Sequence, residues 1–120
     1  MEKVNLTQKL TLFQEHWSPK IVGELNDQLV KLVKFKGDFL WHRHENEDEL
    51  FLVLHGKMIM HLRDQEDIVL NEGEFFIVPR KTEHKPFAEQ ECQVMLFEPK
   101  TTLNTGDKKS DRTVKNLKKI

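Results

Sequence analysis

Short apolar runs, each ended by a turn signal, fill residues 20–99 of this 120-residue chain. The runs are rich in Val, Ile, Leu and Phe, and the breaks between them contain Gly, Asn, Asp or Pro. The pattern predicts strands over residues 20–25, 28–36, 39–44, 49–55, 57–63, 67–70, 75–79, 84–88 and 92–98. Many short strands with frequent turns and almost no helix predict an all-β chain that folds as a sandwich or a small barrel.

The two ends of the chain differ from this central unit, residues 20–99. Apolar residues recur at near-helical spacing within residues 1–19, so we expect an N-terminal extension with a short helix capped by Asn5 or Thr7. Residues 100–120 are polar and basic, and no aromatic residue is interleaved with their charges. We expect a solvated C-terminal tail here rather than an arm that binds nucleic acid.

The charges of the chain nearly balance, with 19 basic and 20 acidic residues. There is no net field to favour nucleic acid or an anionic membrane, so neither is an expected partner. The single cysteine, Cys92, excludes an internal disulfide and suits a reducing compartment. No apolar stretch has the length of a signal peptide core or a membrane span, and we expect a cytoplasmic protein.

Residues 37–56, GDFLWHRHENEDELFLVLHG, combine a histidine pair with a carboxylate and an apolar run. On a strand, His42 and His44 would share one face with Cα atoms about 6.6 Å apart, close enough for both imidazoles to bind one ion. Glu49 begins the next expected strand, and antiparallel pairing would bring its carboxylate beside them. His84 offers a further ligand. Neutral histidines and a carboxylate are ligands that iron, manganese, nickel and zinc accept.

The spacing of these residues resembles the first motif of the cupin family, G-x5-H-x-H-x3or4-E-x6-G. The matching residues are Gly37, His42, His44, Glu49 and Gly56. Only the gap between Gly37 and His42 departs from the motif, because it is one residue short.

A second stretch is similar to the second cupin motif, G-x5-P-x-G-x2-H-x3-N. Gly73, Pro79 and His84 occupy their places in it, whereas Lys81 stands where glycine is usual and Ala88 where asparagine is usual. The change at Lys81 affects the turn that presents His84. Ala88 replaces a residue that is not a metal ligand in the family.

This resemblance implies that residues 20–98 form a double-stranded β-helix, the jelly-roll barrel of the cupin family. It also implies one divalent metal ion inside the barrel, either iron, manganese, nickel or zinc. Members of the family commonly dimerise, so a homodimer is expected. The implied metal ligands are His42, His44, Glu49 and His84.

Two classes of function follow from the resemblance. The first is a metal-binding cupin that binds or converts a small metabolite, as a dioxygenase or a sugar isomerase if it is an enzyme. The second is a non-catalytic module that binds or senses a small ligand. Similar proteins are often labelled mannose-6-phosphate isomerase-like, but a phosphosugar needs clustered basic residues at the pocket mouth. The candidates in this sequence are scattered: Arg43, Arg63, Arg80 and Lys81.

Further residues are candidates for the cavity. His61 lies in an expected strand and is either a group that supports the metal site or a structural histidine. Phe51, Phe76 and Met60 are expected to line the ligand cavity, which would favour a small, partly apolar molecule.

The expected strand at residues 49–55 is apolar on both faces. Leu50, Leu52 and Leu54 alternate with Glu49 and therefore lie on the face opposite to it. This stripe needs a cover, which is either another segment of the same chain or a second subunit.

Overall fold

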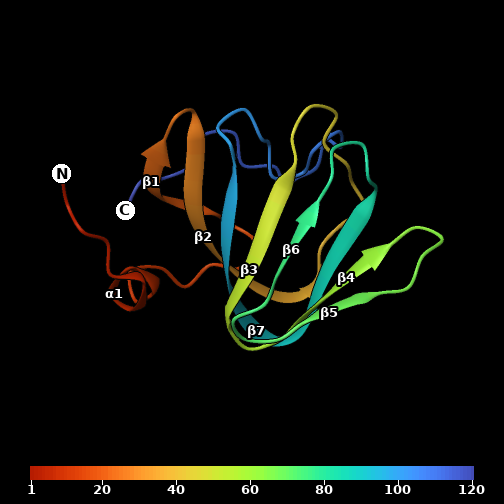
Figure 1. The fold of residues 1–120 in the computed structure, drawn as a ribbon, viewed down its shortest axis with the longest axis horizontal. Helices are drawn as coiled ribbons and strands as arrows, with labels where there is room; N and C mark the ends of the chain where they lie inside the picture. The colour runs from red at the N-terminus through yellow and green to blue at the C-terminus, as the bar shows by residue number, and fades with distance from the viewer.

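The computed structural model describes residues 1–120 and consists almost entirely of antiparallel strands (Figure 1). No helix in it is both long enough and apolar enough to cross a membrane. The prediction of an all-β fold is confirmed. The elements are α1 (Leu6–Leu10), β1 (Lys20–Leu25), β2 (Gln28–Asp38), β3 (Glu49–His55), β4 (Met58–Leu62), β5 (Ile68–Leu70), β6 (Phe75–Val78) and β7 (His84–Pro99).

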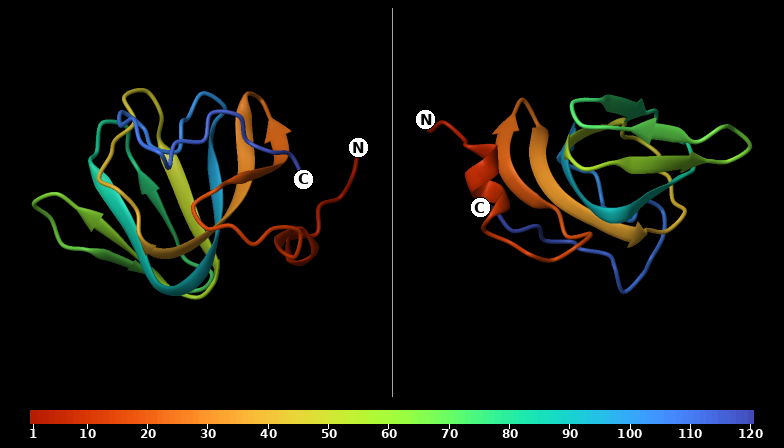
Figure 2. Two further views of the ribbon diagram at one scale, coloured as in Figure 1. Left: turned by 180° about the vertical axis from the view of Figure 1, so that it is seen from behind. Right: turned by 90° about the horizontal axis from the view of Figure 1, so that it is seen from below.

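Strand β7 connects the two walls of the barrel. Its first part pairs with β4, which also pairs with β5, and its second part pairs with β3, which also pairs with β6. Strand β2 pairs with β7 along most of its length, and β1 adds to the outer edge of β2. Because one long strand belongs to both walls, the sheet curls around an interior (Figures 1 and 2).

The structure differs from the expected strands at two places. Residues 84–88 and 92–98 belong to one strand, because the exposed polar residues between them stay extended and form an irregularity opposite β2. Residues 39–44 do not form a strand. From Asp38 to His42 the chain has one residue more than the stretch of β7 that it faces, so only an isolated bridge between His42 and His84 forms.

The alternation of side chains along β3 agrees with the prediction. Glu49, Phe51 and Val53 point into the barrel and are buried, whereas the leucines between them lie half-buried on the outer face. On β7 the same alternation turns Val94 and Leu96 inward, where they join the main apolar core.

The N-terminal segment covers part of the outer face of β2. Its short helix is confirmed, and Asn5 caps it by accepting a hydrogen bond from the Gln8 N–H. Leu10 and Phe13 pack on Leu32 in a second, smaller apolar cluster. This segment covers only one side of the outer face (Figure 2).

The C-terminal segment crosses one end of the barrel (Figures 1 and 2). Thr102 and Thr105 are buried, and the Ile120 N–H donates to the Ile21 carbonyl. The expectation of a solvated tail is therefore wrong for Thr102 and Thr105. The Thr105 hydroxyl donates to the Lys108 carbonyl within the segment, and the Arg112 guanidinium donates to the Asp38 carbonyl at the end of β2.

Candidate metal centre

Four side chains from separate parts of the chain meet inside the barrel. His42 and His44 come from the segment after β2, Glu49 begins β3, and His84 begins β7. At least one nitrogen or oxygen ligand atom of each lies within 4.8 Å of the others, and all four residues are buried. The structure thus brings together the whole set of residues that the sequence indicated.

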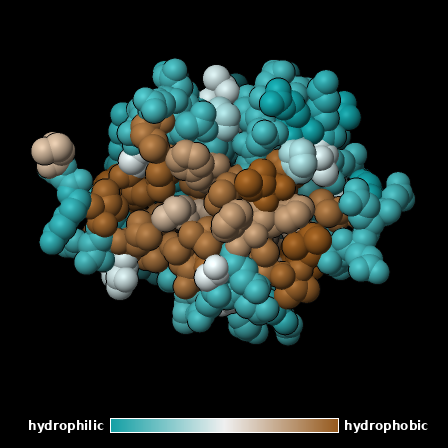
Figure 3. Space-filling view, viewed as in Figure 1, coloured by the Kyte–Doolittle hydropathy of each residue, from teal (hydrophilic) through white to brown (hydrophobic).

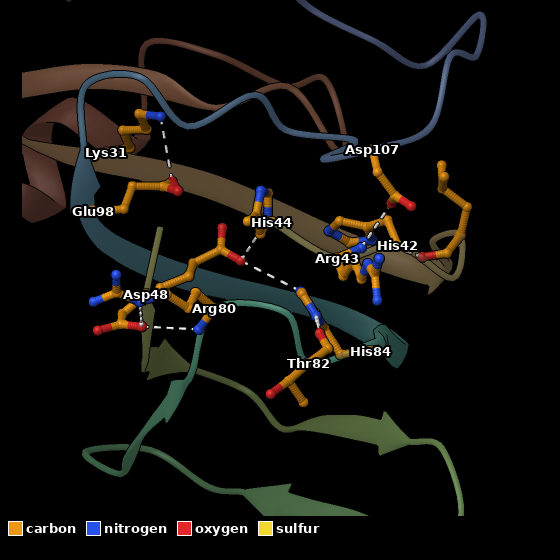
Figure 4. A network of polar contacts seen from close by, with 12 residues as sticks. Lys31, His42, Arg43, His44, Asp48, Arg80, Thr82, His84, Glu98 and Asp107 are labelled. Carbon is orange, nitrogen blue, oxygen red and sulfur yellow. Dashed lines mark hydrogen bonds and ion pairs between the residues drawn. The ribbon is translucent and has the colours of Figure 1, made fainter. Parts of the chain in front are cut away.

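The hydrogen bonds of two rings fix which nitrogen faces the centre. Nδ1 of His42 lies 2.9 Å from the Leu40 carbonyl, and Nδ1 of His84 lies 2.8 Å from the Thr82 carbonyl (Figure 4). A carbonyl oxygen only accepts, so Nδ1 carries the proton in both rings. In a neutral imidazole Nε2 then has a free lone pair, which is the form that a metal ion needs.

Three buried atoms converge in this centre without a hydrogen bond. Nε2 of His44 and Nε2 of His84 lie 3.2 and 3.4 Å from Oε1 of Glu49, yet none of the three atoms has a partner with hydrogen-bond geometry. Buried polar atoms are nearly always paired. Three convergent unpaired atoms, two of them imidazole nitrogens and one a carboxylate oxygen, fit the donor set of a divalent transition-metal ion.

The electrostatics of the centre keep Glu49 charged and His42 neutral. Burial opposes the charge of Glu49, but the contacts with His44 and His84 outweigh it and hold the pKa of Glu49 well below its usual value. Burial, together with the neighbouring His84, lowers the pKa of His42 to about 4. Burial also opposes protonation of His44, but Glu49 outweighs it and raises the pKa of His44.

The turn before His84 keeps the conformation that the missing glycine would favour. Lys81 has a φ of 67°, in the left-handed region that side chains rarely adopt. Its N–H donates to the His44 carbonyl at 2.7 Å. This bond ties the turn to the histidine pair, so the lysine preserves the presentation of His84 despite about 1–2 kcal/mol of backbone strain.

The C-terminal segment holds the histidine pair from outside. The Asp107 N–H donates to the Arg43 carbonyl at 3.0 Å, and the Asp107 carboxylate accepts from the Arg43 N–H at 2.9 Å. Arg43 lies between His42 and His44, so both bonds fix the backbone that carries the two rings (Figure 4). Sequence reasoning missed Asp107, because nothing local distinguishes it within a polar tail.

We predict that Gly106→Ala weakens this support. Gly106 has a φ of 58°, and an added Cβ would overlap the Arg43 carbonyl and lie 3.1 Å from Cδ2 of His42. Gly73→Ala is a matched control, because Gly73 has a φ of 81° but open space around it. Urea denaturation should show a loss of about 1–2 kcal/mol from strain in both variants, and about 1–3 kcal/mol more in Gly106→Ala from overpacking. Equal losses would contradict close packing of the tail.

A cavity of about 30 Å³ lies beside the centre. His42 and Glu49 line one part of it, and its apolar wall includes Phe35, Phe51 and Leu96. Phe51, which the sequence suggested as a cavity residue, is one of the residues in this wall. A compact ligand that is apolar along its body would fit such a wall.

Three other expected residues lie elsewhere. Met60 is fully buried in the apolar core, and Phe76 packs against that core, but neither lines the cavity. His61 alternates with the inward residues of β4, so its ring points outward, where it lies 2.9 Å from Asp67. Met60 and Phe76 thus belong to the apolar core rather than to the wall of this cavity, and His61 lies on the outer side of β4.

Two charged residues in the cavity were missed by sequence reasoning. Lys31 and Glu98 are each only 2% exposed, and Nζ of Lys31 lies 3.3 Å from Oε1 of Glu98 (Figure 4). Burial, together with the neighbouring Glu49, raises the pKa of Glu98 well above its usual value, while the Lys31 ammonium opposes this shift and favours the carboxylate. The sequence contains an indication for Lys31. In the expected strand at 28–36, alternation places Lys31 on the same face as apolar residues that point inward.

Comparisons with known proteins place this fold in a wider group. YdbB of Bacillus subtilis (strain 168) is 38% identical over 64 residues, which are 53% of this chain and 57% of YdbB. The match therefore spans little more than half of that curated relative. Hydroquinone 1,2-dioxygenase from Sphingomonas sp. TTNP3 has a TM-score of 0.75, with 83% of this chain and 32% of the dioxygenase covered. At 16% identity, this likeness shows a shared fold alone.

The family assignment rests on two stronger matches. A cupin-2 domain containing protein from Shewanella frigidimarina NCIMB 400 has a TM-score of 0.78 and 45% identity, and the match covers 80% of this chain and 93% of that one. The family model described as a cupin domain matches residues 29–98, more than half of the sequence. The resemblance read from the two motifs is confirmed, and the chain belongs to the cupin family.

Proposed function

We propose that this cupin binds one divalent metal ion through His42, His44, Glu49 and His84, and that a small metabolite binds or is converted beside it. The observation that carries the proposal is the convergence of unpaired buried ligand atoms on one point. A divalent ion bound there would act as a Lewis acid on a ligand oxygen or, if it is redox-active, would activate O2.

The protein groups around the centre have separate tasks in this proposal. Glu49 supplies negative charge, which offsets part of the charge of the ion. The carbonyls of Leu40 and Thr82 hold His42 and His84 in the tautomer that leaves Nε2 free. The apolar wall limits the access of water to the bound metabolite.

The surroundings of the cavity favour an unphosphorylated metabolite. No arginine lines the cavity. Three candidate arginines pair with surface carboxylates instead, and these pairs are Arg43 with Glu45, Arg63 with Glu83, and Arg80 with Asp48. Binding of a phosphosugar, and with it the sugar-isomerase alternative, therefore has less support than binding or oxygenation of a small uncharged or weakly charged compound.

A metal titration tests the proposal. Protein stripped with a chelator and then dialysed should bind one equivalent of Zn²⁺, Mn²⁺, Ni²⁺ or Fe²⁺ per chain in isothermal titration calorimetry, with Fe²⁺ handled without oxygen. Elemental analysis of protein purified without added metal should find one of these ions. If none of the four binds with micromolar or better affinity, the metal-dependent function is wrong.

We also propose that the chain forms a homodimer through the outer face of β3, β6 and β7. On this face Leu50 of β3 is opposite Ile77 of β6 on one side and opposite Phe97 of β7 on the other. Leu52 of β3 is opposite Phe75 of β6. Ile77 is 48% exposed and Phe75 is 59% exposed. Figure 3 shows a broad apolar area on one side of the molecule. A continuous apolar area of this kind on one chain favours a symmetric partner copy.

The oligomeric state tests the dimer. Light scattering coupled to size-exclusion chromatography should give a dimer mass for the natural sequence and a monomer mass for Ile77→Asp. Val69→Asp is the matched control, because Val69 is also 48% exposed but lies on β5, which pairs only with β4. A monomer before substitution, or a dimer that survives Ile77→Asp, would argue against this interface.

A further inference from the structure

A row of charged residues crosses the inner face of three neighbouring strands. Leu50 of β3 is opposite Phe97 of β7, and the same register sets Glu49 opposite Glu98. Lys31 of β2 is opposite the residue two before Glu98 and so lies diagonal to it. The Lys31–Glu98 pair is thus next to the metal centre within one wall, and both residues line the cavity that His42 and Glu49 also line.

This pair has unused hydrogen-bonding capacity. Oε1 of Glu98 lies 3.3 Å from the Lys31 ammonium, but Oε2 of Glu98 has no partner although it is buried. The Lys31 ammonium has three donors, and the carboxylate of Glu98 is its only ionic partner. One acceptor and at least one donor therefore remain free at the cavity surface.

Lys34, on the opposite face of the same strand, shows what a structural buried lysine looks like here. Its ammonium donates to the Leu10 and Phe13 carbonyls at 2.8 and 2.7 Å and so fastens the N-terminal segment to β2. Lys31 has no such carbonyl partners and fastens no segment. A buried ion pair is also a weak source of stability, because the loss of hydration offsets the attraction between the charges.

We infer that Lys31 and Glu98 form a subsite that binds a hydroxyl group of the metabolite. A hydroxyl accepts one hydrogen bond and donates another, so it can accept from Lys31 and donate to Oε2 of Glu98 at the same time. A carboxylate at this position would be repelled by Glu98, and an ammonium would be repelled by Lys31, so neither group fits this subsite as a hydroxyl does. The substrate class is thus a compact hydroxylated acid or hydroxy-carbonyl compound, with one oxygen toward the four-residue centre and its hydroxyl on this pair.

The inference rests on the proposed function for the oxygen end of the ligand, but the hydroxyl subsite can be tested separately. The probes are 3-hydroxypropionate against propionate and 4-hydroxybutyrate against butyrate, two pairs that place the hydroxyl at different distances from the carboxylate. Dissociation constants are measured by ligand-observed NMR with zinc-treated and with metal-free protein, after the zinc content of each sample has been determined.

At least one hydroxylated acid should bind on the order of tenfold more tightly than its deoxy counterpart, because a site built to bond a hydroxyl leaves its own groups unpaired when the hydroxyl is missing. Lys31→Met and Glu98→Gln should each remove this preference, while Lys36→Met, an exposed position on the same strand, should keep it. If either single variant does not fold, the double variant Lys31→Met/Glu98→Leu replaces it, and it too should lose the preference.

Each outcome bears on one of the two proposals. If no hydroxylated acid is preferred, or if the preference survives in the Lys31 and Glu98 variants, the subsite is wrong even when zinc is bound. If zinc does not bind but the preference is present and is lost in the variants, the subsite stands and the metal-dependent function is wrong.

Discussion

Replacing His44 with alanine is expected to lower the affinity for a divalent ion at least about a hundredfold. Changes to groups that merely support a metal ligand already cost about 10- to 100-fold, so the loss of a ligand itself should cost no less. His44 presents an unpaired Nε2 to the centre at 3.2 Å from Glu49, and alanine offers no donor in its place. Isothermal titration calorimetry with Zn²⁺ on stripped protein gives the comparison.

His61→Ala is the control for this experiment. It also removes an imidazole, but one that is turned outward beside Asp67 and has no contact with the centre. The control should bind zinc as the natural sequence does. Circular dichroism should show the same strand content for both variants, since His44 lies outside the strands. If His44→Ala retains one tightly bound zinc per chain, the proposed ligand set is incorrect.

The four residues of the centre were expected because their spacing resembles the two cupin motifs, and the alternation along one strand supports the place of Glu49. Alternation along β3 alone decides that Glu49 faces inward while Leu50 does not. The short spacing between His42 and His44 keeps the two rings together even without the strand that we expected there, because the bridge to His84 and the two bonds to Asp107 hold this segment extended.

Other features depend on contacts between distant parts of the chain, which no local pattern reports. The bond from Asp107 to Arg43 joins residues far apart in a tail whose composition predicts solvent exposure. The merging of two expected strands into β7 depends on the pairing with β2 on one side and with β3 and β4 on the other. Exposed polar residues ordinarily end a strand, but here the neighbouring strands keep the backbone extended.

The positions of Lys31 and Glu98 depend partly on a local pattern and partly on contacts between distant parts of the chain. Parity alone places Lys31 with Val33 and Phe35, and Glu98 with Val94 and Leu96, on inward faces of expected strands. The two charged side chains lie together beside the metal centre because of the register between β2 and β7. This register cannot be predicted from the alternation within either strand. A charged residue at an inward position of an expected strand is therefore the signal that could have found them.

Glu98→Leu is expected to lower the free energy of unfolding by about 3–5 kcal/mol, because it leaves the Lys31 ammonium buried without its carboxyl partner. The double variant Lys31→Met/Glu98→Leu should recover this loss and reach the natural stability or exceed it by about 1–4 kcal/mol, since apolar side chains of similar size replace both charges. Urea denaturation of metal-free protein at pH 7 measures all three.

The double variant separates a structural role of the pair from a ligand-binding role. A structural pair would leave the double variant clearly less stable than the natural sequence, and that result would remove the main reason for assigning these residues to a ligand. Recovered stability together with a lost hydroxyl preference would mean that the fold does not need the two charges. The burial of these two charges beside Glu49 lowers the stability of the fold, and the binding of a ligand hydroxyl then explains why both are present.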